Sequence, residues 1–229
     1  MFLQQPLSLR IALAALLLVP AGWAQEHVTF STQDGGTVHA DLYGNGPHGV
    51  VLVHGGRFNK EIWRPQARIL ETAGLRVLAI NLRGYGESHG PGEADVFSAP
   101  LHFDVLAAVR YLRKAGCRQA SVVGGSLGGG AAADATVQAK PGEIDALVGL
   151  GNAAGRLSPA RIQGRKLFIV ARDEADGSAL RLPGFQAEYE KMREPKRLII
   201  LEGSAHAQAL FESQHSERVM SEILRFLQP

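Results

Sequence analysis

Residues 124–128 read Gly-Gly-Ser-Leu-Gly, which has the form G-x-S-x-G with Ser126 at its centre. The apolar run at 120–123 before this motif predicts a buried strand, and the alanine-rich run at 127–138 after it predicts a helix. A serine between a strand and a helix lies in a tight, strained turn, where small residues on either side let neighbouring backbone pass close by. The motif therefore predicts a strand–serine–helix turn, and its chemical meaning depends on the partners that the chain brings to Ser126.

Short apolar runs alternate with segments of helical periodicity from residue 25 onward. Strands are predicted at 27–31, 38–43, 50–53, 77–80, 120–123, 146–150, 166–171 and 197–201. Helices are predicted at 61–73, 101–115, 127–138, 185–193 and 211–227. The alternation favours an α/β fold, with a mostly parallel sheet covered by helices on both faces. Because no repeat, low-complexity segment or linker interrupts it, residues 25–229 are predicted to form one domain.

Four groups of polar or glycine residues directly follow predicted strands. They are the His-Gly-Gly at 54–56, Ser126, the acidic stretch 173–176 and His206. Ligand sites of open α/β sheets lie at the carboxyl ends of the strands. We therefore expect these four groups to meet at one edge of the sheet.

Together these motifs resemble the α/β-hydrolase family over essentially all of the chain after residue 24. The His-Gly-Gly at 54–56, the Arg-Gly-Tyr-Gly-Glu-Ser at 83–88 and the Gly-Gly-Ser-Leu-Gly come in the order of that family, followed by the acidic loop and by the Gly-Ser-Ala-His at 203–206. The resemblance implies a mostly parallel, eight-stranded sheet with helices on both faces. The stretch 151–165 is too short for the helical cap that many relatives insert there, so a cap-less member with an open site is expected.

The resemblance also implies a catalytic triad. A serine hydroxyl is a weak nucleophile and needs a base within hydrogen-bond reach, so Ser126 is expected to be the nucleophile and His206 the base. The oxyanion formed during acyl transfer needs preorganised donors. The backbone N–H of Leu127 is expected to be one donor, and the family pattern makes the N–H of Gly56 the other, with Arg57 as the close alternative.

The acid of the triad is less well defined by the sequence. Asp173, Glu174 and Asp176 all lie in the loop where the family carries it. The family register, counted from the start of the preceding strand, places the carboxylate at Glu174. The family's preference for aspartate favours Asp173 or Asp176 instead. We choose Glu174, and the two aspartates stay open as alternatives.

The residue types also bound the reaction. Relatives that open epoxides or remove halogens carry aspartate at the turn, whereas this chain has Ser126, so hydrolysis of small carboxylic esters through an acyl-enzyme is the expected activity. A thioesterase or peptidase with the same triad, and a non-catalytic binding protein that retains the fold, are the alternatives. We expect no metal or organic cofactor.

Composition excludes other classes of function. The 229 residues are 45% hydrophobic and 20% charged, with a formal net charge of +2 and no clustered basic face of the kind that binds nucleic acid. Cys117 is the only cysteine, which excludes an intramolecular disulfide and a zinc cluster. The sequence indicates no oligomeric state.

Residues 1–24 have the pattern of a secretory signal peptide. Arg10 is the only charge before the apolar run 11–19, and small residues at Gly22 and Ala24 suit a signal peptidase. The run is shorter than the ~20 apolar residues that a membrane span needs, although an uncleaved anchor is the alternative. We predict cleavage after Ala24 and a periplasmic or secreted protein without membrane attachment.

This prediction is checked by intact-mass measurement of the protein recovered from the periplasm or the culture medium. Cleavage after Ala24 gives a chain that begins at Gln25. Recovery of a chain that still carries Met1 would contradict the prediction.

Overall fold

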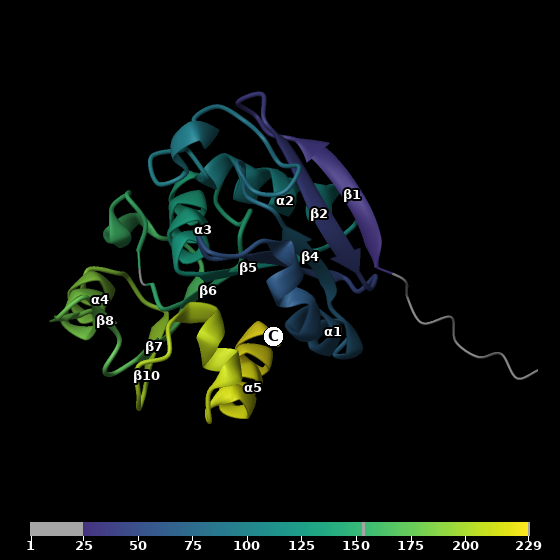
Figure 1. Ribbon diagram of the computed structural model, residues 1–229. Coiled ribbons are helices and arrows are strands. Elements are labelled where there is room, and N and C mark those ends of the chain that lie inside the picture. Colours follow the sequence, from purple (N-terminus) through teal and green to yellow (C-terminus); the bar gives the residue numbers. More distant parts are fainter. Residues whose placement is uncertain (1–24, 153, 229) are drawn as a thin grey trace, which may run out of the picture.

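The computed structural model describes residues 25–152 and 154–228, so the predicted signal peptide lies outside the described residues. Its centre is an eight-stranded sheet in the order β1-β2-β4-β3-β5-β6-β7-β10, in which β1, β2 and β4 pair antiparallel in turn and all other neighbours are parallel (Figure 1). The strands are β1 (Glu26–Ser31), β2 (Thr37–Tyr43), β3 (His48–Val53), β4 (Arg76–Ile80), β5 (Gln119–Gly125), β6 (Ala146–Leu150), β7 (Arg165–Ala171) and β10 (Lys196–Leu201). The predicted mostly parallel α/β sheet is confirmed.

Helices cover both faces of the sheet (Figure 1). They are α1 (Arg64–Thr72), α2 (His102–Lys114), α3 (Leu127–Gln138), α4 (Leu182–Glu190) and α5 (Ser216–Leu227). Side chains of α2, α3 and α4 join one hydrophobic core cluster, and side chains of α1 and α5 join the other. None of these helices has the length and apolar character that a membrane-spanning segment needs, among the residues that the structure describes.

Strand β3 shows why the central strands read as continuous apolar runs. All six of its residues are buried. Val50 and Leu52 pack into one core cluster, while Val51 and Val53 pack into the other. Because successive side chains of a strand point to opposite faces, a strand between two helical layers is apolar at most positions. The exception in β3 is the buried His48, whose Nε2 lies 2.8 Å from Ser121 Oγ.

Three predicted helices differ from the observed ones. The one expected at 61–73 consists of a 3-10 helix, Lys60–Trp63, followed by α1 from Arg64. The one expected at 185–193 begins at Leu182, because a proline in its first turn fits the helical backbone and starts the helix earlier. The one expected at 211–227 is divided into a 3-10 helix, Ala207–Glu212, and α5, with Ser213 extended between them. Ser213 Oγ donates to the Leu210 carbonyl and accepts the His215 N–H, and such local bonds compete with a continuous helix.

The segment between β6 and β7 is short, as the sequence predicted. Over the described residues of 151–164, the one helical element is the 3-10 helix Pro159–Arg161. A small hairpin that the sequence did not predict follows β7, formed by β8 (Ala175–Asp176) and β9 (Ala179–Leu180). The carboxyl ends of the parallel strands are therefore not covered by an inserted helical cap between β6 and β7.

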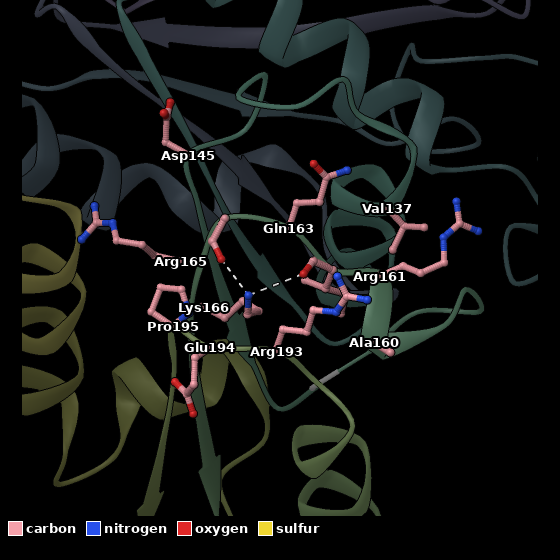
Figure 2. Close-up of a pocket in the computed structure, with 12 residues that line it drawn as sticks. Val137, Asp145, Ala160, Arg161, Gln163, Arg165, Lys166, Arg193, Glu194 and Pro195 are labelled. Atoms are coloured by element: carbon pink, nitrogen blue, oxygen red, sulfur yellow. Dashed lines mark hydrogen bonds between the residues drawn. The ribbon is translucent and has the colours of Figure 1, made fainter.

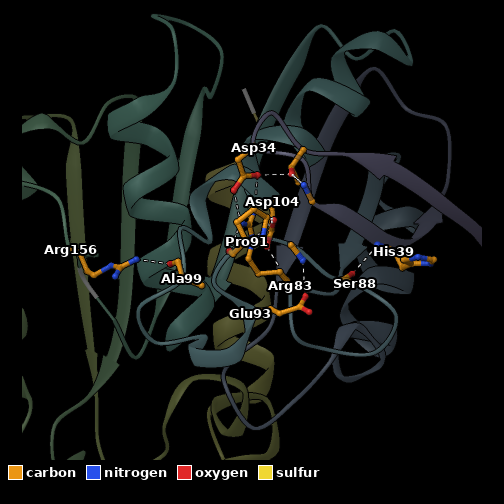
Figure 3. Close-up of polar contacts among 12 residues, drawn as sticks. Asp34, His39, Arg83, Ser88, Pro91, Glu93, Ala99, Asp104 and Arg156 are labelled. Atoms are coloured by element: carbon orange, nitrogen blue, oxygen red, sulfur yellow. Dashed lines mark hydrogen bonds and ion pairs between the residues drawn. The ribbon is translucent and has the colours of Figure 1, made fainter.

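A buried ion-pair cluster fastens the loop after β4. Arg83 and Asp104 are both fully buried, with Arg83 Nη2 2.7 Å from Asp104 Oδ1, and Arg83 Nη1 lies 2.6 Å from Asp34 Oδ2. Arg83 also donates to the Pro91 carbonyl, and Figure 3 shows its guanidinium between the two carboxylates. The cluster thereby joins the β1–β2 turn, the loop after β4 and helix α2.

Replacement of Asp104 by alanine is expected to lower the free energy of unfolding by about 3–5 kcal/mol, because it leaves the Arg83 charge buried without its main partner. Urea unfolding followed by circular dichroism measures the effect. Glu202→Ala is the matched control, since Glu202 pairs with Arg172 on the surface and exposed pairs contribute little. Equal unfolding midpoints for the two variants would contradict the interpretation.

Candidate active site

Ser126 occupies the turn between β5 and α3. Its backbone has φ 52° and ψ −118°, a conformation that costs energy for a residue with a side chain. The surrounding chain holds it there: its N–H donates to the Leu150 carbonyl at 2.9 Å, and its carbonyl accepts from the Gly130 N–H and from Asn152 Nδ2. The predicted strand–serine–helix turn is confirmed.

The glycines of the motif are required by close backbone contacts. A Cβ atom at Gly124 would lie 2.4 Å from the Gly128 carbonyl oxygen, and one at Gly128 would lie 2.4 Å from the Val53 carbonyl oxygen. A Cβ at Gly125 would lie 2.6 Å from Nε2 of the buried Gln208. The first turn of α3 can therefore approach the ends of β3 and β5 only without side chains at Gly124 and Gly128, and the absence of a side chain at Gly125 makes room for Gln208.

His206 lies between Ser126 and Glu174. Its Nε2 is 2.8 Å from Ser126 Oγ, and its Nδ1 is 2.7 Å from Glu174 Oε1. A carboxylate can only accept, so Nδ1 carries the proton and Nε2 is left to accept the serine hydroxyl proton. Gly151, at the end of β6, makes room for the imidazole, because a Cβ there would lie 2.8 Å from His206 Nδ1.

Among the three candidate acids, the structure brings Glu174 to the imidazole. Glu174 is 1% exposed, whereas Asp173 and Asp176 are exposed. Asp176 pairs with Arg181 at 3.1 Å, and the Asp173 backbone N–H donates to the Gly203 carbonyl. The β8–β9 hairpin turns the chain back so that the Arg181 N–H donates to the Glu174 carbonyl, which fixes the backbone of Glu174 beside His206.

The two residues whose backbone donors are expected at the oxyanion position, Leu127 and Gly56, lie on neighbouring segments. A methyl group at Gly56 would be 3.5 Å from Leu127 Cδ2, so the loop after β3 and the start of α3 are in contact. In the described part of the chain, neither the Leu127 N–H nor the Gly56 N–H has a hydrogen-bond partner. Leu127 opens α3, where the helix dipole also favours negative charge. Arg57, the alternative residue, is exposed on the same loop.

His54 is buried beneath the loop after β3, which carries Gly56, and helps to fix its conformation. Its Nε2 accepts the Leu82 N–H at 3.2 Å, so the proton is on Nδ1, which donates to the Gly55 carbonyl at 2.8 Å. Burial lowers the pKa of His54 to about 4, which keeps the ring neutral at physiological pH. Tyr85 packs edge-on against this ring and its hydroxyl donates to the Gly56 carbonyl. Both side chains fix the orientation of the Gly56 peptide.

The sequence analysis missed the residues that shape the loop after β6. Asp134, in the middle of α3, is 7% exposed and accepts the N–H groups of Arg156 and Leu157 at 3.0 and 2.8 Å. Asn152 bonds the Ser126 carbonyl and accepts the Ala154 N–H. An isolated acid within an alanine-rich helix was the available sequence signal for Asp134, whereas nothing local distinguishes Asn152.

A cavity of about 640 Å³ lies away from Ser126, His206 and Glu174 (Figure 2). It is lined by residues at the amino ends of β6, β7 and β10, the opposite edge of the sheet from Ser126. Lys166 is buried there with its ammonium 2.7 Å from the Gly164 carbonyl. Among the described residues, no group of three or more histidine, cysteine, aspartate or glutamate side chains could hold a metal ion.

Comparison with known proteins identifies the family of the chain. Residues 49–214 match the family model described as alpha/beta hydrolase fold. The chain is 37% identical over 108 residues to bifunctional epoxide hydrolase 2 of Sus scrofa, covering 46% of this chain and 19% of that protein. It is 29% identical over 132 residues to the AB hydrolase superfamily protein YisY of Bacillus subtilis, covering 57% and 44%. The chain thus spans less than half the length of these curated relatives.

Solved structures resemble the whole fold. The Pyrococcus furiosus esterase Pf2001 superimposes with a TM-score of 0.75 at 18% identity, covering 90% of this chain and 92% of that chain. Dienelactone hydrolase from Anabaena variabilis superimposes with a TM-score of 0.66 at 21% identity, covering 90% and 95%. At these identities the likeness concerns the fold alone.

Proposed function

The chain belongs to the α/β-hydrolase family, and from this premise we propose that it is a serine hydrolase that cleaves carboxylic esters. The observation that carries the proposal is the continuous hydrogen-bonded chain from Ser126 Oγ through His206 to Glu174. Two backbone N–H groups without a partner among the described residues belong to Leu127, the first residue of α3, and to Gly56, in the loop that contacts Leu127. Nucleophile, base, acid and oxyanion donors are the complete set that acyl transfer requires.

The reaction follows from the roles of these groups. Ser126 Oγ attacks the ester carbonyl while His206 Nε2 takes its proton, and the Leu127 and Gly56 N–H groups bind the oxyanion. When this intermediate collapses, the bond to the alcohol breaks and His206 returns the proton to the leaving oxygen. Water then attacks the acyl-serine in the same way, with His206 as base, and releases the acid. Glu174 keeps the imidazole in the productive tautomer and offsets its transient positive charge.

The nucleophile supports ester cleavage over epoxide opening. Several relatives with detectable sequence identity are named epoxide hydrolases, and one solved structure with the same fold is an esterase. Epoxide-opening members of the family attack with an aspartate at the turn, and this chain has Ser126 there. The residue that would attack, rather than overall similarity, therefore decides the proposed reaction.

The absence of a carboxylate near His206 would have favoured a binding protein without catalytic activity. Glu174 lies 2.7 Å from the imidazole, which removes that argument.

Thioesters and amides present the same carbonyl to the same groups, so a panel of ester, thioester and amide substrates distinguishes these activities. We also propose that residues 1–24 direct export, which places the enzyme in the periplasm or outside the cell.

Labelling of Ser126 tests the proposal directly. The protein without residues 1–24 should hydrolyse p-nitrophenyl acetate and bind a fluorophosphonate covalently at Ser126, located by peptide mass spectrometry. Ser126→Ala should lose both reactions, because the remaining groups supply no nucleophile. Folded protein that shows neither labelling nor turnover of any acyl ester would refute the proposal.

The role of Glu174 has its own test. Glu174→Gln is expected to lower kcat by about 10³–10⁴-fold, because a neutral amide neither fixes the tautomer nor offsets the imidazolium charge. Asp173→Asn and Asp176→Asn are matched controls in the same loop and should retain activity, since both side chains are exposed. Loss of activity in either aspartate variant, with Glu174→Gln active, would assign the acid differently.

A further inference from the structure

A cavity of about 220 Å³ adjoins the catalytic turn on the side of α3. Its walls come from the start and middle of α3, from residues 97–102 before and at the start of α2, and from the loop after β6. Apolar side chains contribute much of the lining, among them Phe97, Leu101, Leu127, Ala131 and Ala154. The established family membership assigns no ligand to it.

The cavity is next to the position where the ester carbonyl would react. Leu127, one of its walls, directly follows Ser126, and Asn152, another wall, donates to the Ser126 carbonyl. A methyl group at Gly56 would lie 3.5 Å from Leu127 Cδ2 and 3.8 Å from Phe97 Cζ. Two residues of the cavity wall therefore lie next to the loop after β3 that carries Gly56, called the oxyanion loop below. Ser126, Gly56 and His206 themselves do not line the cavity, so it borders the reacting position only through Leu127, Asn152 and Phe97. Because the leaving oxygen must face His206, a group in the cavity would belong to the acyl side of the ester.

Most polar groups of the cavity wall are already paired within the protein. The exception is the half-buried His102 imidazole, which has no hydrogen-bond partner among the described residues. The Asp134 carboxylate accepts two backbone N–H groups, and the Asn152 amide bonds the carbonyl of Ser126 and the N–H of Ala154. The Arg156 guanidinium donates to the carbonyls of Ser98 and Ala99, as Figure 3 shows for Ala99. A ligand would thus gain apolar contact here and would find few free polar partners.

We propose that this cavity is the acyl subsite and that it selects an apolar acyl group with no more than about seven non-hydrogen atoms beyond the carbonyl carbon. At the roughly 30 Å³ that one water-sized group occupies, a cavity of 220 Å³ holds about that number. The volume is below the ~300–1,000 Å³ of pockets that take drug-sized ligands. The inference rests on the proposed esterase function and specifies its substrates as esters of short and medium-length apolar acids, up to octanoate.

Gly130 allows the cavity to be made smaller without disturbing the fold. A methyl group there would meet Asn152 Nδ2 at 3.4 Å, the Ala154 carbonyl oxygen at 3.6 Å and Gly155 Cα at 3.6 Å, which are ordinary contacts. Gly130 lies within α3, where alanine is more favourable than glycine. Gly184→Ala is the matched control, since Gly184 lies in helix α4 with no atom within 4 Å of an added methyl group.

The test measures kcat/KM for p-nitrophenyl esters from acetate to hexadecanoate. For the natural sequence, values should rise from acetate to hexanoate or octanoate and fall at least tenfold by dodecanoate. Gly130→Ala should lower the ratio of octanoate to acetate about tenfold, the size of effect that one methylene has in an apolar pocket. Gly184→Ala should leave this ratio unchanged.

The outcomes separate this inference from the proposed function. Turnover of acetate with a rate that keeps rising to hexadecanoate, or that falls steadily from acetate, would overturn the acyl subsite while leaving the esterase in place. An unchanged octanoate-to-acetate ratio in folded Gly130→Ala would do the same. Absence of turnover and of Ser126 labelling with every ester would overturn both. The profile of the natural sequence needs no variant, so the inference is tested even if Gly130→Ala does not fold.

Discussion

The close approach of the first turn of α3 to the end of β3 is the contact on which the site depends. Only a hydrogen atom fits on Gly128, because a Cβ would lie 2.4 Å from the Val53 carbonyl oxygen. This approach compresses the chain between β5 and α3 into one residue, and Ser126 takes the strained backbone that results. It also sets the Leu127 N–H at the start of a helix beside the loop that carries Gly56. One steric constraint thus places the proposed nucleophile and the Leu127 N–H, one of the two proposed oxyanion donors.

The loops around this turn are held by buried polar contacts that differ in kind. Arg83 joins three segments through charge, and since breaking such a pair leaves an isolated buried charge, the arrangement is strongly fixed once formed. Asp134, within helix α3, holds the loop after β6 because its carboxylate accepts two backbone N–H groups of that loop. His54 holds the oxyanion loop without charge, through one donor and one acceptor. Each of these loops is therefore held by a buried side chain, namely Arg83, Asp134 or His54.

The sequence predicted the sheet well because its strands are locally encoded. Most residues of β3 and β5 are apolar or glycine, and the glycine motif between β5 and α3 requires no knowledge of distant residues. The sequence left open which of Asp173, Glu174 and Asp176 faces His206, because that choice depends on contacts that are not local. It depends on the small β8–β9 hairpin, which the sequence did not predict, and on the hydrogen bond from the Asp173 N–H to the Gly203 carbonyl. That hydrogen bond joins segments about thirty residues apart, which no local pattern records. The break before α5 was missed because helical periodicity continues through Ser213, whose side-chain bonds divide the helix.

The hydrogen-bonding state of the groups around Ser126 connects the fold with the proposed chemistry. A polar group already bonded within the protein can fix a loop, but it offers little to a substrate, because using it would require breaking an existing bond. Asp134, Asn152 and the guanidinium of Arg156 are bonded in this way, so their loops are rigid and the cavity beside them is left to apolar contact. The backbone donors of Leu127 and Gly56 are in the opposite state, held in place with no partner. Unpaired donors gain most where negative charge develops, which in ester cleavage is the carbonyl oxygen in the transition state. The same distinction thus separates the polar groups that fix the loops beside the proposed acyl subsite from the backbone donors proposed to stabilise the reacting carbonyl.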